Sequence, residues 1–138
     1  LLPEFNSDQS ILVMNGDILT ASDFINLFHF HKEQHASITL SAIDYHIDIP
    51  FGVIKQKLSK VESIVEKPSQ HFFCNAGIYA LSSDILNKIP NNTFFNMTDL
   101  IDKCLIEEDT VSVFPVHEYW SDIGTVEDLN KARKIFES

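Results

Sequence analysis

The order of apolar and polar positions predicts alternating strands and helices in the first third of the chain. Residues 11–14 form a continuous apolar run of strand length that stops at the polar sequence Asn-Gly-Asp, as in strands covered on both faces. Residues 22–34 repeat apolar side chains at helical spacing, with Ser22 as the expected N-cap. Residues 36–44 then alternate as a strand. This β-α-β succession predicts an α/β fold with a mixed, mostly parallel central sheet.

The rest of the chain predicts a hairpin followed by further strands and helices. Two short strands, residues 51–55 and 61–66, are joined by a polar segment of hairpin length. Later elements are expected at residues 75–81 (strand), 82–89 (short helix), 97–107 (helix), 111–116 (strand) and from 125 onward (helix). Because the sequence contains no internal repeat and no linker, we expect residues 1–138 to belong to one domain.

Composition and charge exclude several classes of partner. The chain has 138 residues, 44% of them hydrophobic, and a net charge of −10, which repels nucleic acid and anionic membrane surfaces. Its apolar runs are too short to span a membrane, and its first residues show no signal-peptide pattern. The two cysteines, Cys74 and Cys104, are too few for a disulfide framework and are interpreted as free thiols. We therefore expect a soluble cytoplasmic protein.

Two aspartates occupy positions suited to a metal. Asp17 follows the first strand, and the carboxyl ends of strands are where α/β sheets bind ligands. Asp122 lies between a strand and the last helix, where it could share one Mg²⁺ with Asp17 and substrate phosphates. Each residue also has a structural interpretation, since Asn-Gly-Asp is a favourable turn and Asp122 could tie down the start of a helix. The residues alone leave both interpretations open.

Three further residues are candidates for substrate binding. Lys67 offers a movable cation for a phosphate, and Glu66 can accept hydrogen bonds from sugar hydroxyls, although exposed Glu-Lys pairs are common. Asn75 can donate and accept hydrogen bonds with a hydroxylated ligand, or can satisfy the backbone at a strand end. No Ser-His-Asp or Cys-His arrangement emerges from the sequence, and no glycine-rich phosphate loop is present in it.

The order of these signals along the chain is more specific than any one of them. The sequence contains, in this order, Asn-Gly-Asp after an apolar strand, Phe51-Gly52-Val53, Val65-Glu66-Lys67-Pro68, Asn75-Ala76-Gly77-Ile78-Tyr79 and Trp120-Ser121-Asp122-Ile123-Gly124-Thr125. Together they resemble the sugar nucleotidyltransferases over residues 11–132. The stretches 96–101 and 118–124 look most like the guanylyltransferase branch that acts on mannose or glucosamine 1-phosphates.

The resemblance implies a fold and a reaction. It implies a Rossmann-like, GT-A-like domain that joins a nucleoside triphosphate, with GTP favoured, to a sugar 1-phosphate and releases pyrophosphate. By this resemblance Asp17 and Asp122 would hold Mg²⁺, and Lys67 would contact the sugar phosphate. Glu66, Asn75 and the backbone of Gly52 would contact the sugar. The expected hairpin would cover the sugar pocket, and a homo-oligomer is compatible with the family.

One departure from the family pattern affects the expected activity. Members open with a G-x-G-T-R-L signature that binds the triphosphate, and this sequence does not contain it. We therefore expect residues 1–138 to be the C-terminal, sugar-phosphate and metal part of an N-terminally truncated domain that is inactive alone. The alternatives are an inert regulatory or scaffolding homologue and a glycosyltransferase. Glycosyltransferases usually carry an Asp-x-Asp pair, which Asn-Gly-Asp does not provide.

Overall fold

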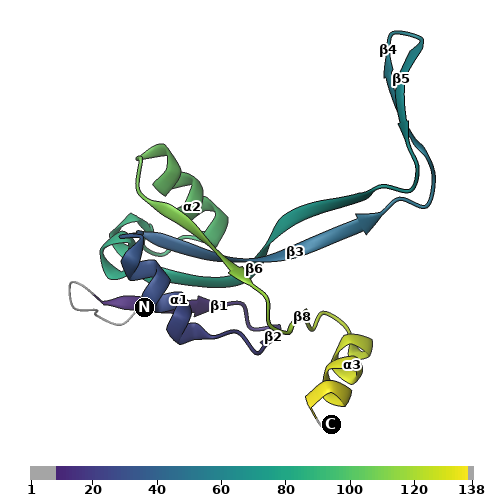
Figure 1. The fold of residues 1–138 in the computed structure, drawn as a ribbon. Coiled ribbons are helices and arrows are strands. Elements are labelled where there is room, and N and C mark those ends of the chain that lie inside the picture. Colours follow the sequence, from purple (N-terminus) through teal and green to yellow (C-terminus); the bar gives the residue numbers. More distant parts are fainter. Residues whose placement is uncertain (1–8, 137–138) are drawn as a thin grey trace. The chain divides into compact units, whose positions relative to one another are not determined.

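The computed structural model of the chain describes residues 9–136 (Figure 1). Residues up to Ile43 and from Asn75 form one compact unit, and Asp44–Cys74 form a second. The elements are β1 (Ser10–Met14), β2 (Ile18–Thr20), α1 (Phe24–Glu33), β3 (Ile38–Asp48), β4 (Val53–Lys57), β5 (Lys60–Val65), β6 (Ser69–Ser82), the 3₁₀ helix η1 (Ser83–Lys88), α2 (Met97–Ile106), β7 (Val111–Val116), β8 (Trp120–Asp122) and α3 (Val126–Phe136).

The first unit is built on a mixed four-stranded sheet of order β1-β6-β3-β7. β1 runs antiparallel to β6, and β3 runs parallel to β7. The Ser82 N–H donates to the Ser37 carbonyl at 2.9 Å, which places the end of β6 beside the start of β3. The expected α/β class and mixed central sheet are therefore confirmed.

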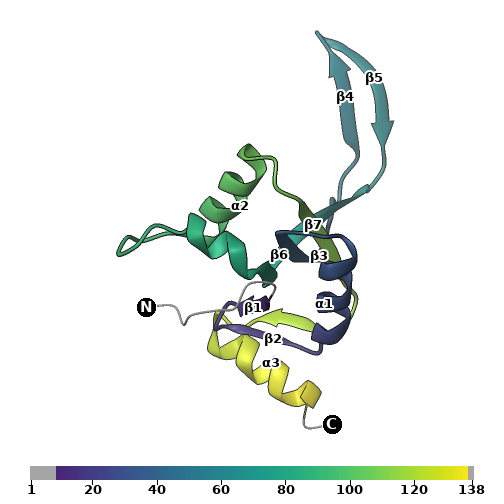
Figure 2. The same cartoon turned by 90° about the vertical axis from the view of Figure 1, so that its left-hand side faces the viewer.

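Both faces of this sheet are covered by helices, and β6 contributes to both cores. Tyr79 and Leu81 pack with residues of η1 and α2 in one buried cluster, whereas Ile78 and Ala80 pack with Leu27 of α1 in another. Figure 2 shows α1 and α2 on opposite sides of the strands. Because neighbouring side chains of a strand point to opposite faces, a continuous apolar run is what a strand between two helical layers requires.

The helix starts follow local hydrogen-bonding chemistry. α1 is capped by Asp23, whose carboxylate accepts from the N–H groups of Ile25 and Asn26 at 3.0 and 3.1 Å. The expectation of Ser22 as N-cap is thus wrong by one residue. The Ser22 hydroxyl instead forms a hydrogen bond with Thr20 at 2.7 Å. Asp23 caps the helix because one of its carboxylate oxygens accepts from two N–H groups of the first turn. Ser22 instead closes the preceding turn.

The second unit contains the hairpin that the sequence predicts. β4 and β5 pair antiparallel from Val53–Val65 to Lys57–Lys60, with a register shift between Lys55 and Gln56. β3 and β6 extend into this unit, so both strands are longer than the pattern indicated. The exposed side chains of these extensions blur the alternation from which strand ends are predicted. No helix in residues 9–136 is long and apolar enough to cross a membrane.

Candidate functional site

A short ladder that the sequence did not predict brings the two candidate metal ligands to neighbouring positions. β2 and β8 pair antiparallel, with Ile18 opposite Asp122. One position further, the Ile123 N–H donates to the Asp17 carbonyl at 2.7 Å. Asp17 and Asp122, 105 residues apart in sequence, therefore occupy adjacent rungs of this ladder. β2 and β8 have only three residues each, too few for an apolar period to be recognised.

Both carboxylates are available for a ligand. Asp17 and Asp122 are exposed, and neither carboxylate forms a hydrogen bond or ion pair with another described residue. Mg²⁺ in proteins is commonly bound by one or two carboxylates, with water and substrate phosphates completing the octahedron, so this donor set fits Mg²⁺. Within residues 9–136, no three His, Cys, Asp or Glu side chains converge on a closed metal site. The pair is thus suited to a metal shared with substrate.

A group of hydrogen bonds links Asn15, at the end of β1, with Asn75, Gly77 and Tyr79 of β6. The Asn15 N–H donates to the Gly77 carbonyl at 2.9 Å, and Gly77 has a φ of 69°. The Asn75 side chain accepts from the Gly77 N–H at 3.0 Å and donates to the Tyr79 hydroxyl at 2.8 Å. Asn75 therefore serves the strand-end role that its sequence position allowed. A carboxamide has one further N–H and a second lone pair, so the exposed Asn75 retains capacity for a ligand.

Trp120 holds β8 against the central sheet. Its Nε1–H donates to the Ala76 carbonyl at 2.8 Å, and its ring packs in the cluster that contains Ile78. At the other end of β8, the Thr125 hydroxyl accepts from the Asp128 N–H at 3.2 Å and so caps α3. Sequence reasoning did not assign a role to Trp120. The single tryptophan of an otherwise polar stretch was the signal that could have identified it.

The second unit brings Gly52 and Glu66 together. A Cβ atom on Gly52 would lie 2.9 Å from Glu66 Oε2, so the carboxylate lies directly against the glycine. Lys67 has a φ of 45°, a backbone conformation that residues other than glycine rarely adopt. The carbonyl of Pro68 accepts from the Ile49 N–H at 3.0 Å and anchors the segment after Lys67. None of the ion pairs among the described residues uses the exposed Lys67 amine.

The six candidate residues thus divide into two groups. Asp17, Asn75 and Asp122 belong to the first unit, and the hydrogen bond from the Ile123 N–H to the Asp17 carbonyl places the backbones of the two aspartates at neighbouring positions. The second unit holds Gly52, Glu66 and Lys67 on the hairpin and the turn that follows it.

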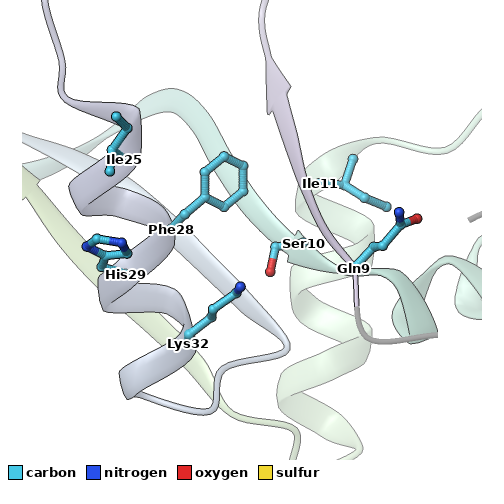
Figure 3. A pocket seen from close by; sticks show the side chains of 7 residues that line it. All are labelled: Gln9, Ser10, Ile11, Ile25, Phe28, His29 and Lys32. Carbon is cyan, nitrogen blue, oxygen red and sulfur yellow. The ribbon is translucent and has the colours of Figure 1, made fainter. Parts of the chain in front are cut away.

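A separate cavity of about 550 Å³ lies between α1 and the start of β1 (Figure 3). The Phe28 ring points from the helix toward β1, and the Lys32 side chain extends toward Ser10. None of the six candidate residues lines it. The lining consists of Gln9, Ser10, Ile11, Ile25, Phe28, His29 and Lys32.

A buried histidine outside the candidate site is fully occupied by structural hydrogen bonds. His31 Nδ1 lies 2.8 Å from the Thr39 hydroxyl, and Nε2 lies 3.2 Å from the Ser82 hydroxyl. Ser82 donates to the Ala36 carbonyl at 2.9 Å, so its oxygen accepts from Nε2–H and leaves Nδ1 to accept from Thr39. Burial lowers the pKa of His31, against the raising effect of Asp84 and with a smaller lowering by Lys32. The ring is therefore a neutral structural link.

Comparison with known proteins identifies relatives along nearly the whole chain. Residues 2–138 match the family model described as nucleotidyl transferase. The chain is 30% identical over 126 residues to the mannose-1-phosphate guanyltransferase of Yarrowia lipolytica, covering 88% of the chain and 34% of that protein. It is 26% identical over 136 residues to a glucose-1-phosphate adenylyltransferase of Clostridium botulinum, covering 88% of the chain and 35% of that protein. The chain thus spans about a third of the length of these curated relatives.

Solved structures show the same fold. HddC from Yersinia pseudotuberculosis superposes with a TM-score of 0.64 at 26% identity, covering 92% of this chain and 55% of that one. The structure of HddC complexed with GMP-PN superposes with a TM-score of 0.63 at 27% identity. The expected GT-A-like nucleotidyltransferase fold is confirmed.

Proposed function

Because the chain belongs to the nucleotidyl transferase family, we propose that it provides the metal and sugar-phosphate part of a sugar-1-phosphate nucleotidyltransferase. The reaction joins the nucleotidyl group of an NTP to a sugar 1-phosphate and releases pyrophosphate. The observation that carries this proposal is the pair of exposed, unbonded carboxylates on neighbouring rungs of the β2–β8 ladder. An inert scaffold has no physical need for two uncompensated aspartates at one strand end.

Asp17 and Asp122 are the residues that would hold Mg²⁺. The bound ion would neutralise phosphate charge so that two anionic substrates can approach each other. The short ladder fixes the two backbones through the 2.7 Å bond between Ile123 and Asp17, which limits the rearrangement needed to bind. The sugar-phosphate oxygen attacks the α-phosphorus as pyrophosphate leaves on the opposite side. No protein nucleophile takes part in this reaction. This agrees with the structure, in which His31 and Ser82 are engaged in structural hydrogen bonds.

The remaining candidates bind and orient the sugar phosphate. The Lys67 amine pairs with the phosphate. The backbone conformation of Lys67, with a φ of 45°, sets the direction in which its flexible side chain leaves the turn. Glu66 accepts from sugar hydroxyls, and Gly52 leaves the space in which that carboxylate lies. Asn75 uses its remaining hydrogen-bonding capacity on the sugar, while Gly77 and Tyr79 hold the amide in one orientation.

For the substrates we propose GTP and a mannose-type sugar 1-phosphate. The support is the likeness to mannose-1-phosphate guanyltransferases at up to 31% identity, beside adenylyltransferase relatives at 25–26%. A catalytically inert regulatory homologue is the rival function. It would bind the sugar phosphate equally well and would release no pyrophosphate.

The test is a pyrophosphate-release assay on the full-length protein with several NTPs and hexose 1-phosphates. Asp17→Asn and Asp122→Asn should each lower kcat by about 100-fold or more, because each removes a metal-ligand charge, while the melting temperature stays within a few degrees. Glu33→Gln is the matched control, since it removes an exposed carboxylate of α1 and should leave turnover unchanged.

Residues 1–138 alone should bind sugar 1-phosphate without turnover, since the sequence lacks the triphosphate-binding signature. Binding one reactant does not supply the aligned geometry of two. Normal activity in both aspartate variants would disprove the metal assignment. Sugar-phosphate binding by a wild-type full-length protein that releases no pyrophosphate would favour the regulatory homologue.

A further inference from the structure

Two histidines lie next to each other on the paired strands of the second unit. His46 belongs to β3 and His71 to β6, and their ring centroids are 5.9 Å apart, with an angle of 33° between the ring planes. Beyond these strands the Ile49 N–H donates to the Pro68 carbonyl at 3.0 Å, three residues from each histidine. Antiparallel pairing from that hydrogen bond places position 46 opposite position 71. The pair lies entirely within residues 44–74.

A carboxylate orients one of the two rings. His71 Nδ1 lies 3.3 Å from Asp44 Oδ1 and 3.4 Å from Asp44 Oδ2. A carboxylate accepts only from a protonated nitrogen, so in the neutral ring Nδ1 carries the hydrogen and Nε2 keeps its lone pair. Metal-binding histidines are commonly held in this way, with one nitrogen hydrogen-bonded to a carboxylate and the other on the metal.

The second ring has no competing partner. His46 is exposed, and its imidazole forms no hydrogen bond or ion pair with another residue in the described part of the chain. Asp44 and His46 are two residues apart on β3, so their side chains project from the same face of that strand. The side chains of His71 and Asp44 are 63% and 60% exposed. An ion from solvent can therefore reach both rings without the loss of a buried contact.

We propose that His46 and His71 bind one divalent transition-metal ion of the Zn²⁺ and Cu²⁺ class, with Asp44 as a positioning residue. Zn²⁺ binds imidazole nitrogen at about 2.0–2.1 Å, so two imidazoles on one ion have centroids about 5–6 Å apart. The observed 5.9 Å lies within this range. Two protein ligands leave the remaining positions to water, which is consistent with the finding that no three such side chains converge within residues 9–136.

This site differs in chemistry and in effect from the aspartate pair of the β2–β8 ladder. Imidazole suits Zn²⁺, Cu²⁺ and Ni²⁺, whereas Mg²⁺ takes oxygen ligands. An ion held by both histidines joins β3 to β6, the strands on either side of the β4–β5 hairpin. Because the unfolded chain does not bring the two rings together, binding stabilises the folded unit by mass action.

Isothermal titration of the full-length protein with ZnCl₂ tests the proposal, with excess Mg²⁺ present to occupy carboxylate sites. His46→Gln and His71→Gln should each raise the Kd for Zn²⁺ by about 100-fold, because the ion loses its second, chelating ligand. Asp44→Asn should raise it by about tenfold, since Asp44 acts only through the orientation of His71. All three residues are exposed, so the melting temperature without metal should change little. His117→Gln, at an exposed histidine of the first unit, is the matched control and should leave the Kd unchanged.

Electron paramagnetic resonance of the Cu²⁺ complex identifies the ligands. At substoichiometric Cu²⁺ the wild type should show coupling to two imidazole nitrogens, and His46→Gln and His71→Gln should each show coupling to one. An unchanged Zn²⁺ affinity in either of these variants, an equal loss of affinity in His117→Gln, or a spectrum that keeps two nitrogens in both variants would overturn the proposal. Wild-type affinity in Asp44→Asn would overturn the positioning role of the carboxylate.

Discussion

Asn15 occupies the space that a side chain on Gly77 would need. A Cβ atom at position 77 would lie 2.7 Å from Asn15 Nδ2 and 3.0 Å from Asn15 Cγ. The backbone of the two residues is also joined, since the Asn15 N–H donates to the Gly77 carbonyl. The end of β1 therefore packs closely against β6, and this packing requires a glycine at position 77. The contact lies at Asn15, two residues before Asp17.

Gly77→Ala should destabilise the protein by about 2 kcal/mol, because it adds both a close contact and a side chain at a φ of 69°. Thermal melting of the full chain measures the loss. Gly16→Ala is the matched control, since a Cβ at Gly16 would meet no atom within 4 Å. Equal melting temperatures for the two variants would contradict the close fit.

Gly52→Ala should weaken sugar-phosphate binding with little effect on folding. The added methyl group would lie 2.9 Å from Glu66 Oε2, so this exposed carboxylate must move. If Glu66 binds the sugar as proposed, losing a charged hydrogen bond should raise KM for the sugar 1-phosphate by about tenfold. Steady-state kinetics of the full-length protein tests this, with KM for the NTP as the internal control. A rise in both KM values, or in neither, would count against the role of Glu66.

Stability should fall with acidity through His31. Its folded-state pKa is lowered by burial, so below the unfolded-state value of about 6.5 the unfolded chain binds more protons than the native one. This contribution to stability is complete at neutral pH and is lost as pH falls from about 6.5, with a slope of at most about 1.4 kcal/mol per pH unit. Urea unfolding of the wild type and His31→Gln between neutral and acidic pH should show a flatter profile for the variant. The exposed His29→Gln should keep the wild-type slope, and a variant profile parallel to the wild type would remove His31 as the cause.

Cys104 should resist alkylation in the native state. Burial, followed by hydrogen bonding to Asp109, raises the pKa of its thiol to about 11, so almost no thiolate is present near pH 8. Cys74 is only half-buried and should react with iodoacetamide at least about tenfold faster. Peptide mass mapping over time distinguishes the two residues. In denaturant the rates should converge, and equal rates in the native protein would be inconsistent with a buried Cys104.

The sequence predicted α1, α2 and β7 close to their observed positions, because the apolar side chains of each element repeat at the spacing of its secondary structure. The exposed hairpin was predicted instead from two short strands joined by a polar segment of hairpin length. The β2–β8 ladder escaped prediction because three-residue strands show no period, and it is this ladder that places the backbones of Asp17 and Asp122 on neighbouring rungs. The two aspartates could be identified as candidates from their places at strand ends. Their neighbouring backbone positions could not be predicted, because these depend on a pairing across 105 residues of sequence.

The placement of the hairpin between β3 and β6 has a consequence for folding kinetics. Pairing of two strands is slow when a long loop must first be closed, but here the two-residue turn at Leu58–Ser59 closes first and locally. Pairing can then propagate from β4–β5 to the hydrogen bond between Ile49 and Pro68, and on along β3 and β6 to the hydrogen bond between Ser37 and Ser82. Each new pair forms next to pairs that already exist. A circular permutant opened between residues 58 and 59 would keep every native pairing and lose this sequential zipping, so its refolding rate would fall far more than its stability.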